Sequence, residues 1–177
     1  MRKIILGLAV SLDGFIEGPN GEYDWCFTDQ DYGMSDFFKR IDAVFMGRKS
    51  YELALGMGNE AMGMPKMDEY VFSNTLQSVE GDRILVSGDI ANKIREIQNR
   101  PGKDIWLFGG AALTASLMNL GLIDEFWLSV HPVVLGSGKP LFQNISGRKN
   151  LKLVDAKTYS TGLVSLKYEP MQLSNIL

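Results

Sequence analysis

The stretch AVFMGRKSYELAL, residues 43–55, decides the fold because it joins a strand, a turn and a helix in one order. An apolar run typical of a buried strand comes first, Gly47 ends it, and Ser50 to Leu55 has the period of a helix. The stretch DIWLFGGAALTASLMNL, residues 104–120, repeats this order with two glycines at the junction. Units of this kind are typical of an α/β domain with a largely parallel sheet.

Apolar runs elsewhere predict the remaining elements. Residues 56–67 show neither the helical nor the strand period and predict an irregular connection. We expect strands at residues 4–10, 70–72, 84–86 and 123–130, helices ending near Arg40 and covering 90–97, and a hairpin of strands 151–156 and 164–168. The pattern predicts an α/β fold with a mixed, mostly parallel central sheet, helices on both faces and a C-terminal antiparallel hairpin.

Length and composition exclude several classes of protein. With 177 residues, 45% of them hydrophobic, the chain fits one domain over residues 1–177. A formal net charge of −3 gives no basic surface for nucleic acid, and no apolar run of about 18 residues predicts a membrane span. Cys26 is the only cysteine, which excludes an internal disulfide and a multi-cysteine metal site and favours the cytoplasm. We expect no bound metal.

Three polar blocks follow predicted strands and suit a phosphate group. Backbone N–H groups at a helix start attract anions, and glycines let a ligand approach the backbone closely. Each block alone equally describes a capped surface helix or a packing turn, and the full G-x-G-x-x-G pattern is absent. Together they predict a phosphorylated dinucleotide, NADPH. The blocks are Gly47, Arg48, Lys49 and Ser50; Ser73, Asn74 and Thr75; and Gly109, Gly110, Ala111 and Ala112.

Several single residues are candidates for contact with a small-molecule substrate. Asp13 follows the first strand and suits either a substrate N–H or a local turn with Gly14. His131 is the only histidine and precedes a proline, so a structural role is favoured over proton donation. Residues 135–142 predict a lid, in which Lys139 meets a substrate phosphate or stays solvated. The substrate candidates are Trp25, Gly136 and Lys139.

Five sequence blocks, in their order along the chain, resemble those of proteins with the dihydrofolate reductase fold. The resemblance is closer to one branch, the reductase domain of bacterial riboflavin biosynthesis enzymes. The blocks that carry the resemblance are SLDGFI (11–16), MGRKSYE (46–52), FSN (72–74), WLFGGA (106–111) and PVVLGSGKP (132–140). The resemblance implies a three-layer fold. It also implies that NADPH binds along the three polar blocks, with residues 73 and 74 near the 2′-phosphate, and that the peptide bond between Gly109 and Gly110 is cis. Such a bond costs about 3 kcal/mol.

The same resemblance separates two reductase hypotheses. Dihydrofolate reductases hold the pterin with a carboxylate on the first helix, but alignment places Met34 there, and Asp36 would point away. Met34 is therefore a further substrate candidate. Ser129 matches the hydroxyl that partners this carboxylate, and Ser129 and Asp13 are the candidate catalytic residues. The riboflavin-type enzymes instead reduce a phosphoribosylamino-pyrimidine.

We therefore expect an NADPH-dependent reductase of the 5-amino-6-(5-phosphoribosylamino)uracil reductase type. The zinc signature of the deaminase domain that usually accompanies it is absent from this sequence. A dihydrofolate or pteridine reductase and a non-catalytic NADP-binding module are the alternatives. The resemblance also implies a homodimer.

Overall fold

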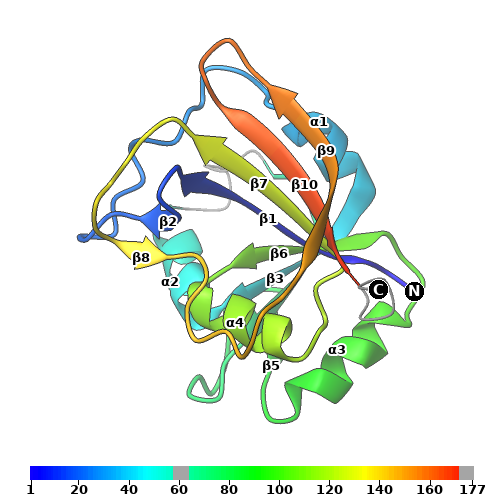
Figure 1. The fold of residues 1–177 in the computed structure, drawn as a ribbon. Helices are drawn as coiled ribbons and strands as arrows, with labels where there is room; N and C mark the ends of the chain where they lie inside the picture. The colour runs from blue at the N-terminus through cyan, green and yellow to red at the C-terminus, as the bar shows by residue number, and fades with distance from the viewer. Residues whose placement is uncertain (58–63, 172–177) are drawn as a thin grey trace.

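The computed structural model describes residues 1–57 and 64–171, which form one central sheet flanked by helices and a small second sheet (Figure 1). The elements in chain order are β1 (Ile4–Ser11), β2 (Phe15–Glu17), α1 (Met34–Arg40), β3 (Ile41–Gly47), α2 (Arg48–Met57), β4 (Asp68–Phe72), β5 (Ile84–Val86), α3 (Ile90–Gln98), β6 (Asp104–Gly109), α4 (Ala111–Asn119), β7 (Glu125–His131), β8 (Lys139–Pro140), β9 (Leu151–Thr158) and β10 (Val164–Pro170).

The central sheet has the strand order β5-β4-β3-β6-β1-β7-β10-β9. The strands from β5 to β7 run parallel, whereas β10 is antiparallel to β7 and β9 to β10. The mixed, mostly parallel sheet and the hairpin that closes its edge are therefore confirmed. The carboxyl ends of all the parallel strands lie along the same side of the sheet, which we call the carboxyl edge. The side along which their amino ends lie is the amino edge.

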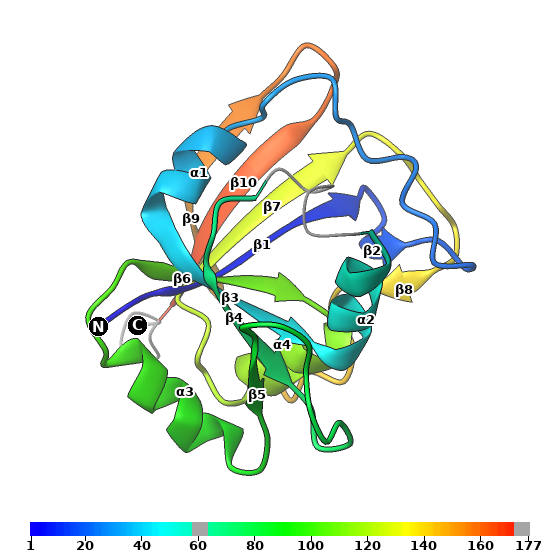
Figure 2. The ribbon, with the colours of Figure 1, turned by 180° about the vertical axis from the view of Figure 1, so that it is seen from behind.

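Helices cover both faces of the sheet, as Figures 1 and 2 show from opposite sides. Successive residues of a strand face opposite ways, so Ile4 of β1 packs in the cluster that contains Leu117 of α4. Its neighbour Ile5 packs in the cluster that contains Phe37 of α1. The three-layer α/β fold is confirmed, and both layers of core form from continuous apolar runs.

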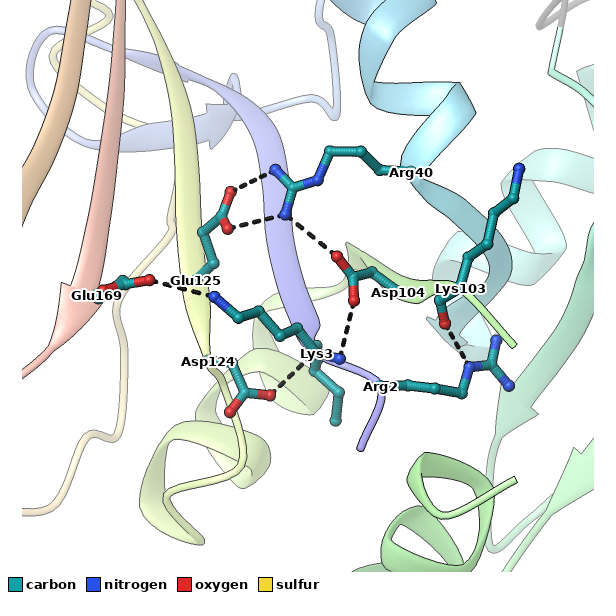
Figure 3. Close-up of polar contacts among 9 residues, drawn as sticks. Arg2, Lys3, Arg40, Lys103, Asp104, Asp124, Glu125 and Glu169 are labelled. Carbon is teal, nitrogen blue, oxygen red and sulfur yellow. Dashed lines mark hydrogen bonds and ion pairs between the residues drawn. The ribbon is translucent and has the colours of Figure 1, made fainter. Parts of the chain in front are cut away.

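The amino edge carries a network of ion pairs, and Figure 3 shows those of Arg40 and Lys3. Arg40, the last residue of α1, places Nη1 2.9 Å from Glu125 Oε1 and Nη2 3.2 Å from Asp104 Oδ2. Lys3 Nζ lies 3.3 Å from Glu169 Oε1, and Arg2 pairs with Asp42. These pairs join α1 and the starts of four strands to the end of β10.

The sequence did not predict β2 and β8, which form a separate antiparallel pair. They contain three and two residues and are too short to show a strand period. Their pairing places Glu17 opposite Lys139. Residues 56–67 were predicted as an irregular connection, and the part of it at 58–63 lies outside the described residues.

Candidate active site

The three polar blocks meet at the carboxyl edge. Because β3, β4 and β6 are parallel neighbours, the residues that follow them lie side by side although they are far apart in sequence. They line a cavity of about 400 Å³, here called the groove. Its lining includes Gly47, Arg48, Lys49, Ser73, Asn74, Gly110, Ala111 and Ala112. The strand order thus brings residues of all three blocks to one groove.

The junction between β6 and α4 turns through its two glycines. Gly109 and Gly110 have φ of 122° and 58°, a region that other residues rarely adopt. A Cβ on Gly110 would lie 3.5 Å from Ser50 Oγ, so this turn approaches the start of α2. The expected cis peptide is wrong: the bond between Gly109 and Gly110 is trans. The two positive φ angles reverse the chain without it.

Charge and hydrogen bonding differ among the groove residues. Arg48 is exposed and lies 3.8 Å from Glu52, a long ion pair, and Lys49 has no ion-pair partner among the described residues. Ser73 Oγ accepts from the N–H of Leu76 at 3.1 Å, and Asn74 Oδ1 accepts from the N–H of Gly88 at 2.9 Å. The two cations are therefore the groups that a bound anion can recruit, while Ser73 and Asn74 also shape the loop.

A larger cavity of about 610 Å³ adjoins the groove, and we call it the main cavity. Lys49, Gly110 and Lys139 line both spaces, so the two cavities adjoin at these residues. Ser50 and Gly109 line the main cavity rather than the groove. The adjoining spaces therefore place the polar blocks at one end and the lining of the main cavity at the other.

Aromatic side chains form much of the main cavity. Phe37, Trp106 and Trp127 pack together, with ring centroids 5.5 Å apart for Phe37 and Trp106 and 4.7 Å for Phe37 and Trp127. The Trp106 indole N–H donates to Gly7 O at 2.8 Å, and that of Trp127 donates to Ser165 Oγ at 2.6 Å. Both polar atoms are satisfied within the protein, so these rings offer apolar surface to a ligand.

The first helix presents Met34 to the main cavity, as the alignment predicts. The side chain of Asp36 is 86% exposed and pairs with Lys39 at 2.8 Å, so it points away from the cavity. Two acidic residues line the cavity, Glu17 and Asp31, and Asp31 is the one that lies next to this helix. Ser35 donates to Asp31 from its hydroxyl and its N–H, which lowers the pKa of the Asp31 carboxyl and keeps it ionised. Sequence reasoning missed Asp31 because it precedes the helix.

His131 lines the main cavity and is buried, at 3% exposed. Its Nε2 accepts from the N–H of Phe27 at 3.1 Å, and its Nδ1 lies 2.9 Å from the carbonyl of Ser129, which fixes a neutral ring with the proton on Nδ1. Burial lowers the pKa of His131 from its ordinary value of 6.5. The ring therefore holds the loop that contains Phe27 against β7, and the structural role is the one that the geometry favours.

Ser129 and Asp13, the candidate catalytic residues, occupy different places. Ser129 is half-buried on β7 and lines the main cavity. Asp13 is exposed, and its carboxylate accepts from the N–H groups of Leu135 at 3.1 Å and Gly136 at 2.8 Å. The hydroxyl of Ser11, which donates to it, lowers the pKa of Asp13 most. Asp13 thus holds the loop after β7 rather than lining the cavity.

The other substrate candidates are divided as well. Gly136 is exposed and binds Asp13, and neither Gly136 nor Trp25 is among the described residues that line the main cavity. Trp25 packs edge-on against His131, with centroids 5.4 Å apart. Lys139 lines the cavity and pairs with Glu17 at 3.1 Å. Cys26 also lines it, and burial raises the pKa of its thiol to about 11, so the thiolate is scarce near neutral pH.

Comparison with known proteins agrees with this geometry. The RibD C-terminal domain family model matches residues 2–165. The chain belongs to this family. The curated relatives include the uncharacterized proteins YyaP and YwjB of Bacillus subtilis, 47% and 35% identical, with 94% of this chain covered in each case and 94% and 97% of the relatives. Membership in the RibD C-terminal domain family supports a reductase of the RibD type.

Solved structures of similar proteins show the same fold. A protein from Shewanella sp. PV-4, described as belonging to riboflavin biosynthesis, has a TM-score of 0.85 and 25% identity, covering 97% of this chain and 100% of its own. The deaminase/5-amino-6-(5-phosphoribosylamino)uracil reductase of Thermotoga maritima has a TM-score of 0.75 and 14% identity over 96% of this chain and 57% of its own. Dihydrofolate reductase of Enterococcus faecalis, solved with NADP(H), has a TM-score of 0.67 and 13% identity over 96% and 97%.

The residues of this RibD-type domain fit a dinucleotide. The first residues of α2 and α4, Arg48 and Ala111, both line the groove, so two helix N-termini face it. Thr114 supplies a further sign that the sequence analysis missed. Its hydroxyl oxygen is fully buried without a hydrogen-bond partner, and Thr114 lines the main cavity. A buried hydroxyl without a hydrogen-bond partner, on the helix that follows the glycine turn, is suited to a polar ligand atom.

Two further classes of site and segment are not found in the described residues. Among residues 1–57 and 64–171, no group of three or more His, Cys, Asp or Glu side chains is placed to hold a metal ion. No helix in those same ranges has the length and apolar character needed to cross a membrane.

Proposed function

We propose that this chain is an NADPH-dependent reductase that transfers hydride to a small heterocyclic substrate. The observation that carries the proposal is that the groove and the main cavity adjoin and share Lys49, Gly110 and Lys139. One end offers cations and helix N-termini to phosphates, and the other offers aromatic walls to a flat ring. Family membership supports the reductase class.

In this proposal the groove residues position the cofactor, which supplies the hydride when bound. Arg48 and Lys49, together with Ser73 and Asn74 at the next strand end, bind the 2′-phosphate, while residues 109–112 follow the pyrophosphate. The Thr114 hydroxyl binds a polar atom of the nicotinamide half, because it lies buried on the main-cavity side. The aromatic walls exclude water from the reacting atoms.

The proton route in this proposal passes by Ser129. Its hydroxyl lies on β7 within the main cavity, whereas both carboxylate oxygens of Asp13 bind backbone N–H groups outside it. Asp13 then acts as a positioning residue for the loop that leads to Lys139. The neutral His131 keeps its only ring proton on the Ser129 carbonyl, which leaves none for the substrate.

Met34 favours a pyrimidine over dihydrofolate as the substrate. No carboxylate of α1 faces the cavity, because Met34 lines the cavity and the Asp36 side chain lies in solvent. Dihydrofolate reduction stays the second candidate because the ionised Asp31 lines the same cavity and can accept from a substrate N–H.

NADPH consumption by the purified protein tests the proposed function. Dihydrofolate and 5-amino-6-(5-phosphoribosylamino)uracil are offered in parallel, together with the unphosphorylated form of the latter. Turnover of either pyrimidine supports the riboflavin-type reaction. Turnover of dihydrofolate, increased by Met34→Asp, supports the pteridine alternative instead. Tight NADPH binding without any turnover supports a non-catalytic binding module.

A further inference from the structure

The charged groups around the main cavity cancel one another. Two lysines line it, Lys49 and Lys139, and so do two carboxylates, Glu17 and Asp31. The buried His131 is neutral for the reasons given above. The two segments outside the described residues, 58–63 and 172–177, contain no lysine, arginine or histidine in their sequence. The cavity therefore offers little net attraction to a second phosphate beside an anionic cofactor.

One of the two lysines is already held by a carboxylate. Lys139 Nζ lies 3.1 Å from Glu17 Oε1, with side chains 25% and 35% exposed. The other, Lys49, lines the groove as well and is assigned to the cofactor phosphates in the proposed function. A phosphorylated substrate would have to break the Glu17–Lys139 pair to gain a cation.

The small sheet places this ion pair by its register. Glu17 of β2 and Lys139 of β8 are directly opposite partners. A Cβ on Gly138 would lie 2.2 Å from the carbonyl oxygen of Glu17, and Gly138 has a φ of 144°. Only glycine allows this approach of the two backbones. The pair is therefore built into the fold rather than formed by two free surface side chains.

The remaining lining suits a flat ring without charge. Phe27, Phe37, Trp106 and Trp127 line the main cavity, and the two indole N–H groups are bonded within the protein. Such rings bind planar heterocycles by stacking and edge contacts. They provide nothing that binds a phosphate.

We propose that Glu17, by holding Lys139 in an ion pair, makes the main cavity select a flat, uncharged heterocycle over its phosphorylated counterpart. Glu17 is then a specificity-determining residue that acts through Lys139. The inference rests on the proposed function, which assigns Lys49 to the cofactor. It separates this chain's substrate from the phosphorylated pyrimidine that the family resemblance implies.

A matched ligand pair tests the inference without requiring turnover. The dissociation constants of 5-amino-6-ribitylaminouracil and its 5′-phosphate are measured by calorimetry on protein saturated with NADP⁺. We expect the wild type to bind the unphosphorylated compound about tenfold more tightly. Glu17→Gln, which frees Lys139 while keeping the side-chain shape, should strengthen binding of the phosphate about tenfold and leave the other compound unchanged.

Two variants control for indirect effects. Glu17→Gln combined with Lys139→Gln should lose the gain for the phosphate, because the freed cation is gone. Glu169→Gln breaks an exposed pair with Lys3 at the opposite edge and should leave both constants unchanged.

Three results would overturn the inference: equal or tighter binding of the phosphate by the wild type, an equal effect of Glu17→Gln on both compounds, or binding of neither to the NADP⁺ complex. Failure of NADP⁺ itself to bind would count against the proposed function instead.

Discussion

The two edges of the sheet use charge in opposite ways. At the amino edge, Arg40 is shared between Glu125 and Asp104, and Lys3 pairs with Glu169 (Figure 3). At the carboxyl edge, Arg48 has only a long contact with Glu52, and Lys49 has no ion-pair partner among the residues that the structure describes. The pairs at the amino edge join elements of the fold, whereas Arg48, with its long contact, and Lys49, unpaired within the described ranges, are cations available to a ligand.

Polar groups inside the protein follow the same contrast. At the amino edge, Gln98 is 3% exposed and its amide donates to the carbonyl of Arg2. At the carboxyl edge, the buried hydroxyl of Thr114 has no partner. Buried polar groups without a partner cost stability and are often kept where they have a function, so Thr114 makes the carboxyl edge the place to test for ligand binding.

The largest effect is expected from the double variant Arg48→Ala with Lys49→Ala. Each charge-assisted hydrogen bond to a phosphate contributes about 1.5–3 kcal/mol, so the affinity for NADPH should fall about a hundredfold or more. The affinity for NADH, which lacks the 2′-phosphate, should fall much less. Calorimetric titration with both cofactors measures this difference. Lys39→Ala, which removes an exposed cation of α1, is the control. Equal weakening of NADPH and NADH would refute the 2′-phosphate assignment.

Arg40→Met should act on stability and spare the ligand site. It leaves the carboxylate of Glu125, which is 10% exposed, without its bidentate partner. We expect a loss of about 2 kcal/mol in the free energy of unfolding, below the 3–5 kcal/mol of fully buried pairs because Arg40 is 38% exposed. Urea unfolding measures it, with Lys3→Met as the exposed-pair control. A loss no larger than the control's would show that the network adds nothing to the fold.

Thr114→Val sharpens the contrast between binding and stability at one residue. Removing a buried hydroxyl without a partner should raise the free energy of unfolding by about 1 kcal/mol, while NADPH binding weakens. Thermal unfolding and cofactor titration on the same samples give both quantities. Ser116→Ala is the matched control on the same helix, because the Ser116 hydroxyl already donates to the carbonyl of Ala112 at 3.0 Å. A lower free energy of unfolding for Thr114→Val would contradict the conclusion that the Thr114 hydroxyl has no hydrogen-bond partner.

The smallest effect concerns pH and His131. Folding lowers the pKa of this histidine below 6.5, so below that pH the unfolded chain binds more protons than the native one. The stability that neutral His131 contributes is complete above 6.5 and decreases as pH falls toward its folded pKa. Urea midpoints at pH 8 and pH 5.5 should differ more for the wild type than for His131→Gln. Equal differences would mean that another group titrates.

Local sequence was sufficient for the elements with a strong period. The strand and helix of residues 43–55 and those of 104–120 have one apolar run and one glycine turn each, and both units are present in the structure. Local sequence could not predict which short segments pair with each other. β2 and β8 are defined only by each other, across more than a hundred residues, and so the Glu17–Lys139 contact could not be read from either stretch.

The sequence by itself determined the α/β class, the three polar blocks that follow predicted strands and the absence of a carboxylate at Met34, because each of these depends on residues adjacent in the chain. Only the tertiary structure decided that the blocks share one groove, that Asp31 rather than Asp36 reaches the main cavity, and that Asp13 holds a loop. It also showed a trans bond between Gly109 and Gly110. Such features depend on strand order and on contacts between distant segments, which no local pattern contains.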